Sequence, residues 1–131
     1  MIDFELCPCS GATLDKLIRP AILSVLTAGP LHGYSLVEKL AELRIARGCR
    51  PDATGIYRAL HSMQEADFVT ARWDTKTGGP ARRIYRLTPR GRQCLKRWVA
   101  TLAEYDAALR QLLATARRAS RPIRSAGKAR A

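Results

Sequence analysis

A polar helix face and an arginine-rich hairpin follow one another between Pro51 and Thr88, and these residue types suit nucleic acid. On the predicted helix, Ile56, Leu60 and Met63 recur at positions i, i+4 and i+7, which defines one apolar stripe. At about 100° per residue, the opposite face carries hydrogen-bonding side chains near the start of the helix. They are Thr54, Arg58, His61 and Glu65, flanked by Tyr57 and Ser62. Such a face can read base edges in a major groove, with Tyr57 gripping a phosphate.

The hairpin is predicted from two strand-forming runs around a glycine turn. The first run ends at Trp73, the turn contains Gly78, Gly79 and Pro80, and the second run covers residues 82–87. Glycines allow the positive dihedrals of a tight tip, and proline without an amide hydrogen belongs in the loop. Its basic side chains would hold the DNA backbone or enter the minor groove: Lys76, Arg82 and Arg83. The alternative is an ordinary surface hairpin whose arginines are only solvated.

Charge and length favour a basic, single-domain protein of 131 residues. The formal net charge is +12, from 23 Lys and Arg against 11 Asp and Glu, which is the footprint expected of a nucleic-acid partner. Residues 115–131 hold six of the basic residues and no acid, so half of the excess lies in the tail. We expect residues 118–131 to be a disordered basic tail that either touches phosphate nonspecifically or only aids solubility.

Several classes of protein are disfavoured by what the sequence lacks. No run approaches the roughly 20 apolar residues of a membrane span, and the N-terminus has no signal-peptide pattern, so we expect a cytoplasmic protein without a membrane partner. A phosphate-cradling glycine loop, a serine nucleophile motif and a plausible acid pair are all missing, so we do not expect an enzyme.

Two helices should support the polar helix, in a winged-helix domain covering residues 14–88. The first has Ile22, Val25 and Leu26 on its apolar face, and Pro20 implies a kink or a fresh start. The second is predicted from about Gly33 to Arg47. Its inward side chains would be Leu36, Val37, Leu40 and Leu43.

A long helix over residues 89–117 is predicted after Thr88-Pro89, with threonine as N-cap and proline at the first helical position. Apolar residues repeat along it with heptad spacing: Leu95, Trp98, Leu102, Tyr105, Leu109 and Leu112. The helix would be roughly 40 Å long, which is too long for so small a domain to cover. The seam therefore predicts a homodimer, and the alternative is a helix folded back on its own domain. The fold class is mostly α with a two-stranded β wing, plus this dimerisation helix.

Three ordered motifs make the chain resemble the PadR family of bacterial transcriptional regulators. They are residues 29–34 (GPLHGY), 56–60 (IYRAL) and 78–88 (GGPARRIYRLT), and the match covers about residues 14–113. The resemblance implies a dimeric winged-helix protein, usually a repressor, whose affinity for operator DNA falls when an effector binds or conditions change. It also implies that Tyr57 is the tyrosine of the recognition helix and that the wing includes Gly79, Arg82, Arg83 and Tyr85. Gly55 and Ile84 depart from the family's pattern, so no operator sequence can be transferred.

An N-terminal arm, residues 1–13, contains Cys7-Pro8-Cys9, and Cys49 precedes the polar helix. These cysteines either bind a soft metal or sense redox state, or they are structural or incidental, because the spacing is not that of a usual zinc site. No cofactor is assigned. Cys94 is expected to be a small buried hydrophobe, and His32 to cap or pack at a helix entrance. Trp98 and Tyr105 either line a pocket for a flat aromatic effector or pack in the dimer interface.

Two functions follow from these residues. The first is sequence-specific binding of double-stranded operator DNA by a dimer, probing a near-palindrome with two heads about 34 Å or a multiple of it apart. Repression would then be released by an effector or by a metal or redox signal. The second is nonspecific binding of nucleic acid, in which charge matters and sequence does not.

Overall fold

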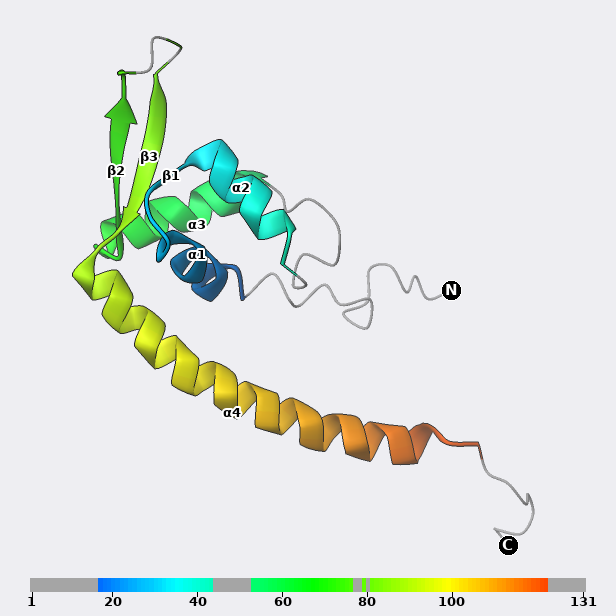
Figure 1. Ribbon diagram of the computed structural model, residues 1–131. Coiled ribbons are helices and arrows are strands. Elements are labelled where there is room, and N and C mark those ends of the chain that lie inside the picture. Colours follow the sequence, from blue (N-terminus) through cyan, green and yellow to red (C-terminus); the bar gives the residue numbers. More distant parts are fainter. Residues whose placement is uncertain (1–16, 44–52, 77–78, 80, 123–131) are drawn as a thin grey trace, which may run out of the picture. The chain divides into compact units, whose positions relative to one another are not determined.

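The structure is a computed structural model that describes residues 17–43, 53–76, 79 and 81–122. Figure 1 shows the elements within these residues. Their order is α1 (Ile18–Leu26), β1 (Leu31–His32), α2 (Gly33–Ala41), α3 (Ala53–Glu65), β2 (Val69–Asp74), β3 (Arg82–Leu87) and α4 (Pro89–Ser120). The contacts of the chain separate into two units, with the boundary after Lys96 inside α4, and each unit is treated by itself.

Three short helices enclose the core of the first unit. The apolar stripes of α1, α2 and α3 face one another, and the largest side chains among them are fully buried. These are Ile22, Leu23, Leu26, Leu36, Leu40, Ile56, Leu60 and Met63, with Val69 of β2 closing one end. Fully burying such a side chain is worth about 1.5–3 kcal/mol, so this cluster fixes how α3 is held. The predicted stripe of α3 is confirmed by Ile56, Leu60 and Met63.

The first helix starts afresh near Pro20 rather than being kinked there. Because α1 begins at Ile18, Pro20 lies in the first turn, where a missing amide hydrogen costs no helical hydrogen bond. Ile22 and Leu26 are buried as predicted, whereas Val25 is only half-buried. Leu23 is fully buried and was not expected on the apolar face.

The second helix is shorter than predicted, because it ends at Ala41 instead of near Arg47. Leu36, Val37 and Leu40 are buried as expected. Leu43 was expected to point inward, but it is 36% exposed, because the core surrounds the helix only as far as Leu40.

The predicted hairpin is present and gains a third strand. β2 and β3 pair antiparallel, with Val69 opposite Leu87 and Asp74 opposite Arg82. β1 pairs antiparallel with the other edge of β3, which gives the strand order β1-β3-β2. The sequence prediction had a two-stranded wing and did not include β1. The added strand joins the entrance of α2 to the wing.

A tight junction connects the sheet to α4. The Thr88 hydroxyl accepts a hydrogen bond from the Gly91 amide at 2.9 Å and donates one to the Asp67 carbonyl at 2.6 Å. Thr88 is therefore the N-cap that the sequence predicted. The Phe68 carbonyl oxygen accepts a bond from the Thr88 amide and leaves no room for a side chain on Gly91.

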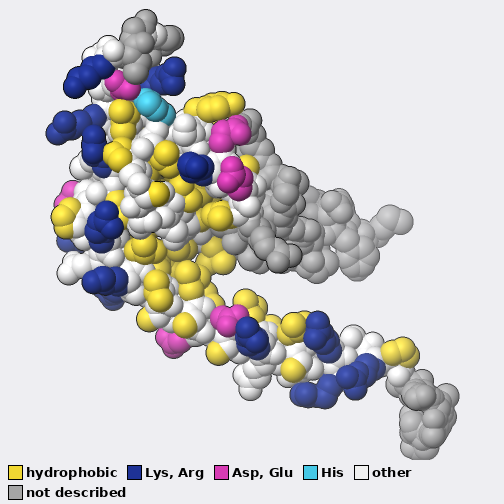
Figure 2. All heavy atoms as spheres, in the orientation of Figure 1, with side chains coloured by type: hydrophobic (Ala, Val, Ile, Leu, Met, Phe, Trp, Pro, Cys, Tyr) yellow, Lys and Arg dark blue, Asp and Glu magenta, His cyan; other side chains and the backbone are white. Residues whose placement is uncertain are grey.

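The long helix α4 has 32 residues and continues three residues beyond its predicted end. Its apolar seam is open in the single chain, since Tyr105, Leu109 and Leu112 are exposed, whereas Leu95, Trp98 and Leu102 are half-buried. Cys94 is half-buried rather than buried, because it lies beside the seam and not in the core. Figure 2 shows hydrophobic side chains along α4 and basic side chains gathered toward its C-terminal end.

Candidate nucleic-acid interface

The polar face of α3 is exposed, as its sequence periodicity predicts. Thr54, Arg58, His61 and Glu65 are all exposed, while the buried stripe anchors the opposite side of the helix. Nε2 of His61 lies 3.7 Å from Oε1 of Glu65 one turn later, and both side chains are exposed to solvent. A rigid helix with its donors outward is the arrangement that a major-groove reader needs.

Tyr57 lies on the flank of α3 and packs against the first residue of α2. A Cβ atom added to Gly33 would come within 2.6 Å of the Tyr57 hydroxyl oxygen and 2.8 Å of its ring carbon Cε1. The absence of a side chain at Gly33 therefore makes room for the Tyr57 ring. This contact holds the Tyr57 hydroxyl beside the first residue of α2.

The wing carries an arginine stacked between aromatic rings. The guanidinium carbon of Arg83 lies 5.5 Å from the centre of the Trp73 ring and 6.0 Å from that of Tyr85. Tyr85 is 4% exposed, and burial raises the pKa of its hydroxyl above the ordinary value of 10.0, so the hydroxyl stays protonated. Trp73, in contrast, is 64% exposed.

Asp74 ties the wing to the entrance of α2. Its Oδ2 lies 3.0 Å from Nε2 of His32, and its Oδ1 accepts a hydrogen bond from the Lys76 amide at 3.1 Å. The bond with His32 is the main reason that the pKa of the Asp74 carboxyl is lowered, and the bond from Lys76 adds to it. His32 thus packs at the helix entrance as the sequence predicted, and its partner is the end of β2.

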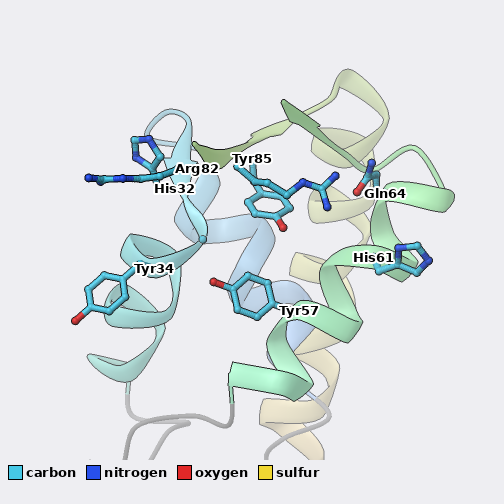
Figure 3. A pocket seen from close by; sticks show the side chains of 9 residues that line it. His32, Tyr34, Tyr57, His61, Gln64, Arg82 and Tyr85 are labelled. Carbon is cyan, nitrogen blue, oxygen red and sulfur yellow. The ribbon is translucent and has the colours of Figure 1, made fainter. Parts of the chain in front are cut away.

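A groove of about 420 Å³ separates α3 from the wing. Figure 3 shows the Tyr85 ring pointing toward Tyr57, whose own hydroxyl points toward α2, whereas Tyr34 and His61 point outward at the margins of the groove. None of the described residues that line the groove is an aspartate or a glutamate. They are His32, Gly33, Tyr34, Tyr57, His61, Gln64, Arg82, Arg83 and Tyr85. The arginine side chains in this lining are hydrogen-bond donors suited to an anion such as a phosphate.

The structure brings most of the sequence-predicted interface residues to one side of the first unit. Tyr57, His61, Arg82, Arg83 and Tyr85 line the groove, and Thr54 and Arg58 lie on the exposed face of α3. Lys76 and Gly79 are exposed near the turn of the hairpin. Figure 2 shows basic side chains around this hairpin.

Sequence reasoning did not assign Trp73, Gln64 or Tyr34 to this surface, and it placed His32 at the helix entrance without its partner Asp74. Trp73 was placed only in a strand, although counting the hairpin register back from the glycine turn sets it opposite Arg83. His32 could not be linked to Asp74 without β1, which two residues of sequence cannot reveal.

The cysteine hypothesis concerns residues outside the described part of the chain. Cys7, Cys9 and Cys49 all lie there, and within the described residues no cluster of His, Cys, Asp and Glu is suited to a metal. No helix in the described residues is long and apolar enough to cross a membrane.

A family model for the transcriptional regulator PadR-like family matches residues 22–97, which is more than half of the chain. The chain belongs to this family. PadR-like proteins are regulators rather than enzymes, and the winged-helix fold of this chain is theirs. No curated protein is similar enough to count as a match.

Solved structures agree with this assignment. A protein of unknown function described as a potential transcriptional factor has 33% sequence identity and a TM-score of 0.63, covering 77% of this chain and 88% of its own. A putative transcriptional regulator from Thermoplasma acidophilum has 27% identity and a TM-score of 0.68, covering 79% and 96%. Bacillus subtilis PadR in complex with operator DNA has 26% identity and a TM-score of 0.55, covering 63% of this chain and 46% of the other.

Proposed function

We propose that this PadR-like protein is a sequence-specific regulator that binds double-stranded operator DNA as a homodimer and represses transcription there. The observation that carries the proposal is the exposed polar face of α3, held beside an arginine-bearing wing across a groove whose described lining includes Arg82 and Arg83 and no acidic residue. The similar Bacillus subtilis PadR was solved with operator DNA, which supports the same partner here. A protein acting on operator DNA would work in the cytoplasm.

Within this interface, the residues divide into two roles. Arg58, with Thr54 and His61, reads base edges in the major groove. Tyr57 grips a phosphate beside the start of α2, where it is fixed against Gly33. The wing residues Lys76, Gly79, Arg82 and Arg83 approach the backbone and the minor groove, while Tyr85 supports them from the core.

The seam of α4 is the proposed dimerisation surface. Leu109 and Leu112 are each 61% exposed in the single chain, and with Leu95, Trp98, Leu102 and Tyr105 they share one heptad stripe. A contiguous apolar stripe of this kind is unfavourable in water and calls for a partner surface. Two-fold pairing would place two copies of α3 about 34 Å apart or a multiple of it, on a near-palindromic site.

Two signals could release the protein from the operator. A flat aromatic effector between Trp98 and Tyr105 of the paired helices fits the exposed ring of Tyr105. A metal or redox signal at Cys7, Cys9 and Cys49 is the alternative, and it concerns residues outside the described ranges.

Replacement of Arg58 tests the assignment of α3. Titrations would use a duplex enriched from a random pool and an unrelated duplex. Arg58→Ala should weaken binding to the enriched duplex by about 1–3 kcal/mol while barely changing binding to the unrelated one. The matched control is Arg92→Ala, which removes an exposed positive charge from α4 instead of from α3.

Two results would contradict the proposal. If Arg58→Ala and Arg92→Ala weaken both duplexes alike, α3 does not read sequence. If the unmodified protein binds both duplexes equally, the second candidate function applies, namely nonspecific binding through the net charge of +12.

A further inference from the structure

Neighbouring arginines of β3 serve opposite faces of the wing. Successive side chains of a strand alternate between faces, so Arg83 shares its face with the buried Tyr85, and Arg82 shares the other face with Ile84. Figure 3 shows Arg82 beside His32, pointing away from the rings of Tyr57 and Tyr85. The side chains of Arg82 and Arg83 therefore leave β3 on opposite faces, although both residues border the groove.

Arg83 is held on its face by two aromatic rings. Trp73 is its direct partner across the β2–β3 ladder, and the guanidinium carbon lies 5.5 Å from the Trp73 ring centre and 6.0 Å from the Tyr85 ring centre. Stacking restricts the long side chain while leaving the edge of the guanidinium able to donate hydrogen bonds. Within the described part of the chain, the Arg83 guanidinium contacts these two rings and no carboxylate.

Trp73 makes a small contribution to the core. Its ring is 64% exposed, whereas Val69 at the other end of the same strand face is fully buried. Single exposed apolar side chains are common on protein surfaces, so the exposure of Trp73 matters here only because its ring contacts Arg83. The contact with Arg83 provides a functional reason for an aromatic ring at position 73.

The position of the groove indicates which part of a bound DNA duplex Arg83 would contact. If α3 enters a major groove and the wing reaches the adjacent minor groove, a sugar-phosphate strand must pass between α3 and β3. The groove lies there, with Tyr57 on the α3 side, Arg83 on the β3 side and no acid in its lining. We propose that Arg83 binds a backbone phosphodiester in this groove and that Trp73 is its positioning residue. This inference rests on the proposed DNA-binding function.

The test measures affinity and salt dependence for the enriched and the unrelated duplex. Arg83→Ala should weaken binding to both duplexes by a similar factor and should reduce the slope of log affinity against log salt by about one unit. Trp73→Leu keeps apolar bulk but removes the aromatic face, and it should weaken both duplexes about two- to fivefold, as expected for an exposed cation–π contact. Trp73→Phe keeps an aromatic face and should restore most of the affinity.

A double-variant comparison separates positioning from general damage to the wing. If Trp73 acts through Arg83, the double variant Trp73→Leu/Arg83→Ala should bind like Arg83→Ala alone. The matched pair is Trp73→Leu with Arg82→Ala, whose losses should multiply, because Arg82 leaves from the opposite face of β3. Thermal unfolding of each variant checks that the wing is retained.

The outcomes distinguish this inference from the function on which it rests. An unchanged salt slope for Arg83→Ala overturns the phosphodiester assignment, and multiplying losses for Trp73→Leu and Arg83→Ala overturn the positioning role. In both cases the unmodified protein still prefers the enriched duplex. Failure of the unmodified protein to bind any duplex would instead overturn the proposed function together with this inference.

Discussion

The Tyr57 ring occupies the space that a side chain on Gly33 would need. A Cβ atom added to Gly33 would lie 2.6 Å from the Tyr57 hydroxyl oxygen. The Tyr57 ring of α3 therefore packs directly against the backbone of Gly33, the first residue of α2. The contact couples the recognition helix to the entrance of its supporting helix. It also places the hydroxyl proposed to grip DNA at a defined point of the groove.

Gly33→Ala should therefore impair DNA binding more than stability. The clash is with the far end of a side chain that can swing away, and alanine improves helix propensity by up to about 1 kcal/mol, so the free energy of unfolding should change little. The displaced ring should weaken duplex binding. Urea unfolding and duplex titration would measure both effects. In a Tyr57→Ala background the same glycine replacement should leave affinity unchanged, and a loss there would contradict the explanation.

Gly91→Ala should, in contrast, reduce the stability of the protein. Its added Cβ would run into the Phe68 carbonyl oxygen and would lie 2.7 Å from Cδ1 of Leu87. Backbone cannot swing away, so we expect a loss of about 1–3 kcal/mol in the free energy of unfolding, in spite of alanine's better helix propensity. Urea unfolding beside Gly33→Ala provides the comparison. Equal free energies of unfolding for the two variants would contradict this prediction, because they would show that the backbone at the start of α4 can shift to accommodate the added Cβ atom.

Asp74 should make the stability of the wing dependent on acid pH. The His32 hydrogen bond, and after it the Lys76 amide, lower the pKa of the folded carboxyl below its ordinary 3.8. A carboxyl with a depressed folded pKa adds stability above its unfolded pKa and loses it as pH falls through the folded value. Asp74→Asn should thus be less stable than the unmodified protein at neutral pH, and the difference should shrink below pH 3.8.

Urea unfolding of both proteins from neutral pH to below that value would measure this difference. A His32→Ala background is the control, because it removes the largest cause of the lowered pKa and should reduce the pH-dependent part. A gap between Asp74→Asn and the unmodified protein that stays constant through the acid range would refute the assigned role of the carboxylate.

Leu109→Glu should convert the proposed dimer to monomers. Leu109 lies in the middle of the exposed α4 seam, and pairing would bury its side chain against a second chain. A carboxylate there would have to be desolvated on association. Sedimentation at micromolar concentration would measure the mass, with Gln111→Glu as control, since it adds the same charge to an exposed position off the seam. Unchanged association of Leu109→Glu would place the dimer contact elsewhere.

Periodicity predicted the elements that are long enough to carry it. Ile56, Leu60 and Met63 define α3 by spacing alone, and the glycine turn of the hairpin fixes the strands on either side of it. The cap at Thr88 was readable because a threonine followed by proline is a strong local signal.

The contacts that shape the interface depend on residues distant in sequence. β1 has two residues, too few for a period, and it forms only because β3 offers a free edge. The pairing of His32 with Asp74 spans 42 residues and follows from that strand. The opposite faces of Arg82 and Arg83 could, in contrast, be predicted from strand alternation once the hairpin was predicted.

Selection of duplexes from a random pool by the purified full chain tests the central claim most directly. The account predicts enrichment of one near-palindromic sequence whose half-sites are centred about 34 Å, or a multiple of it, apart, bound by two chains. A pool that stays random after selection, with binding that depends on salt alone, would contradict it.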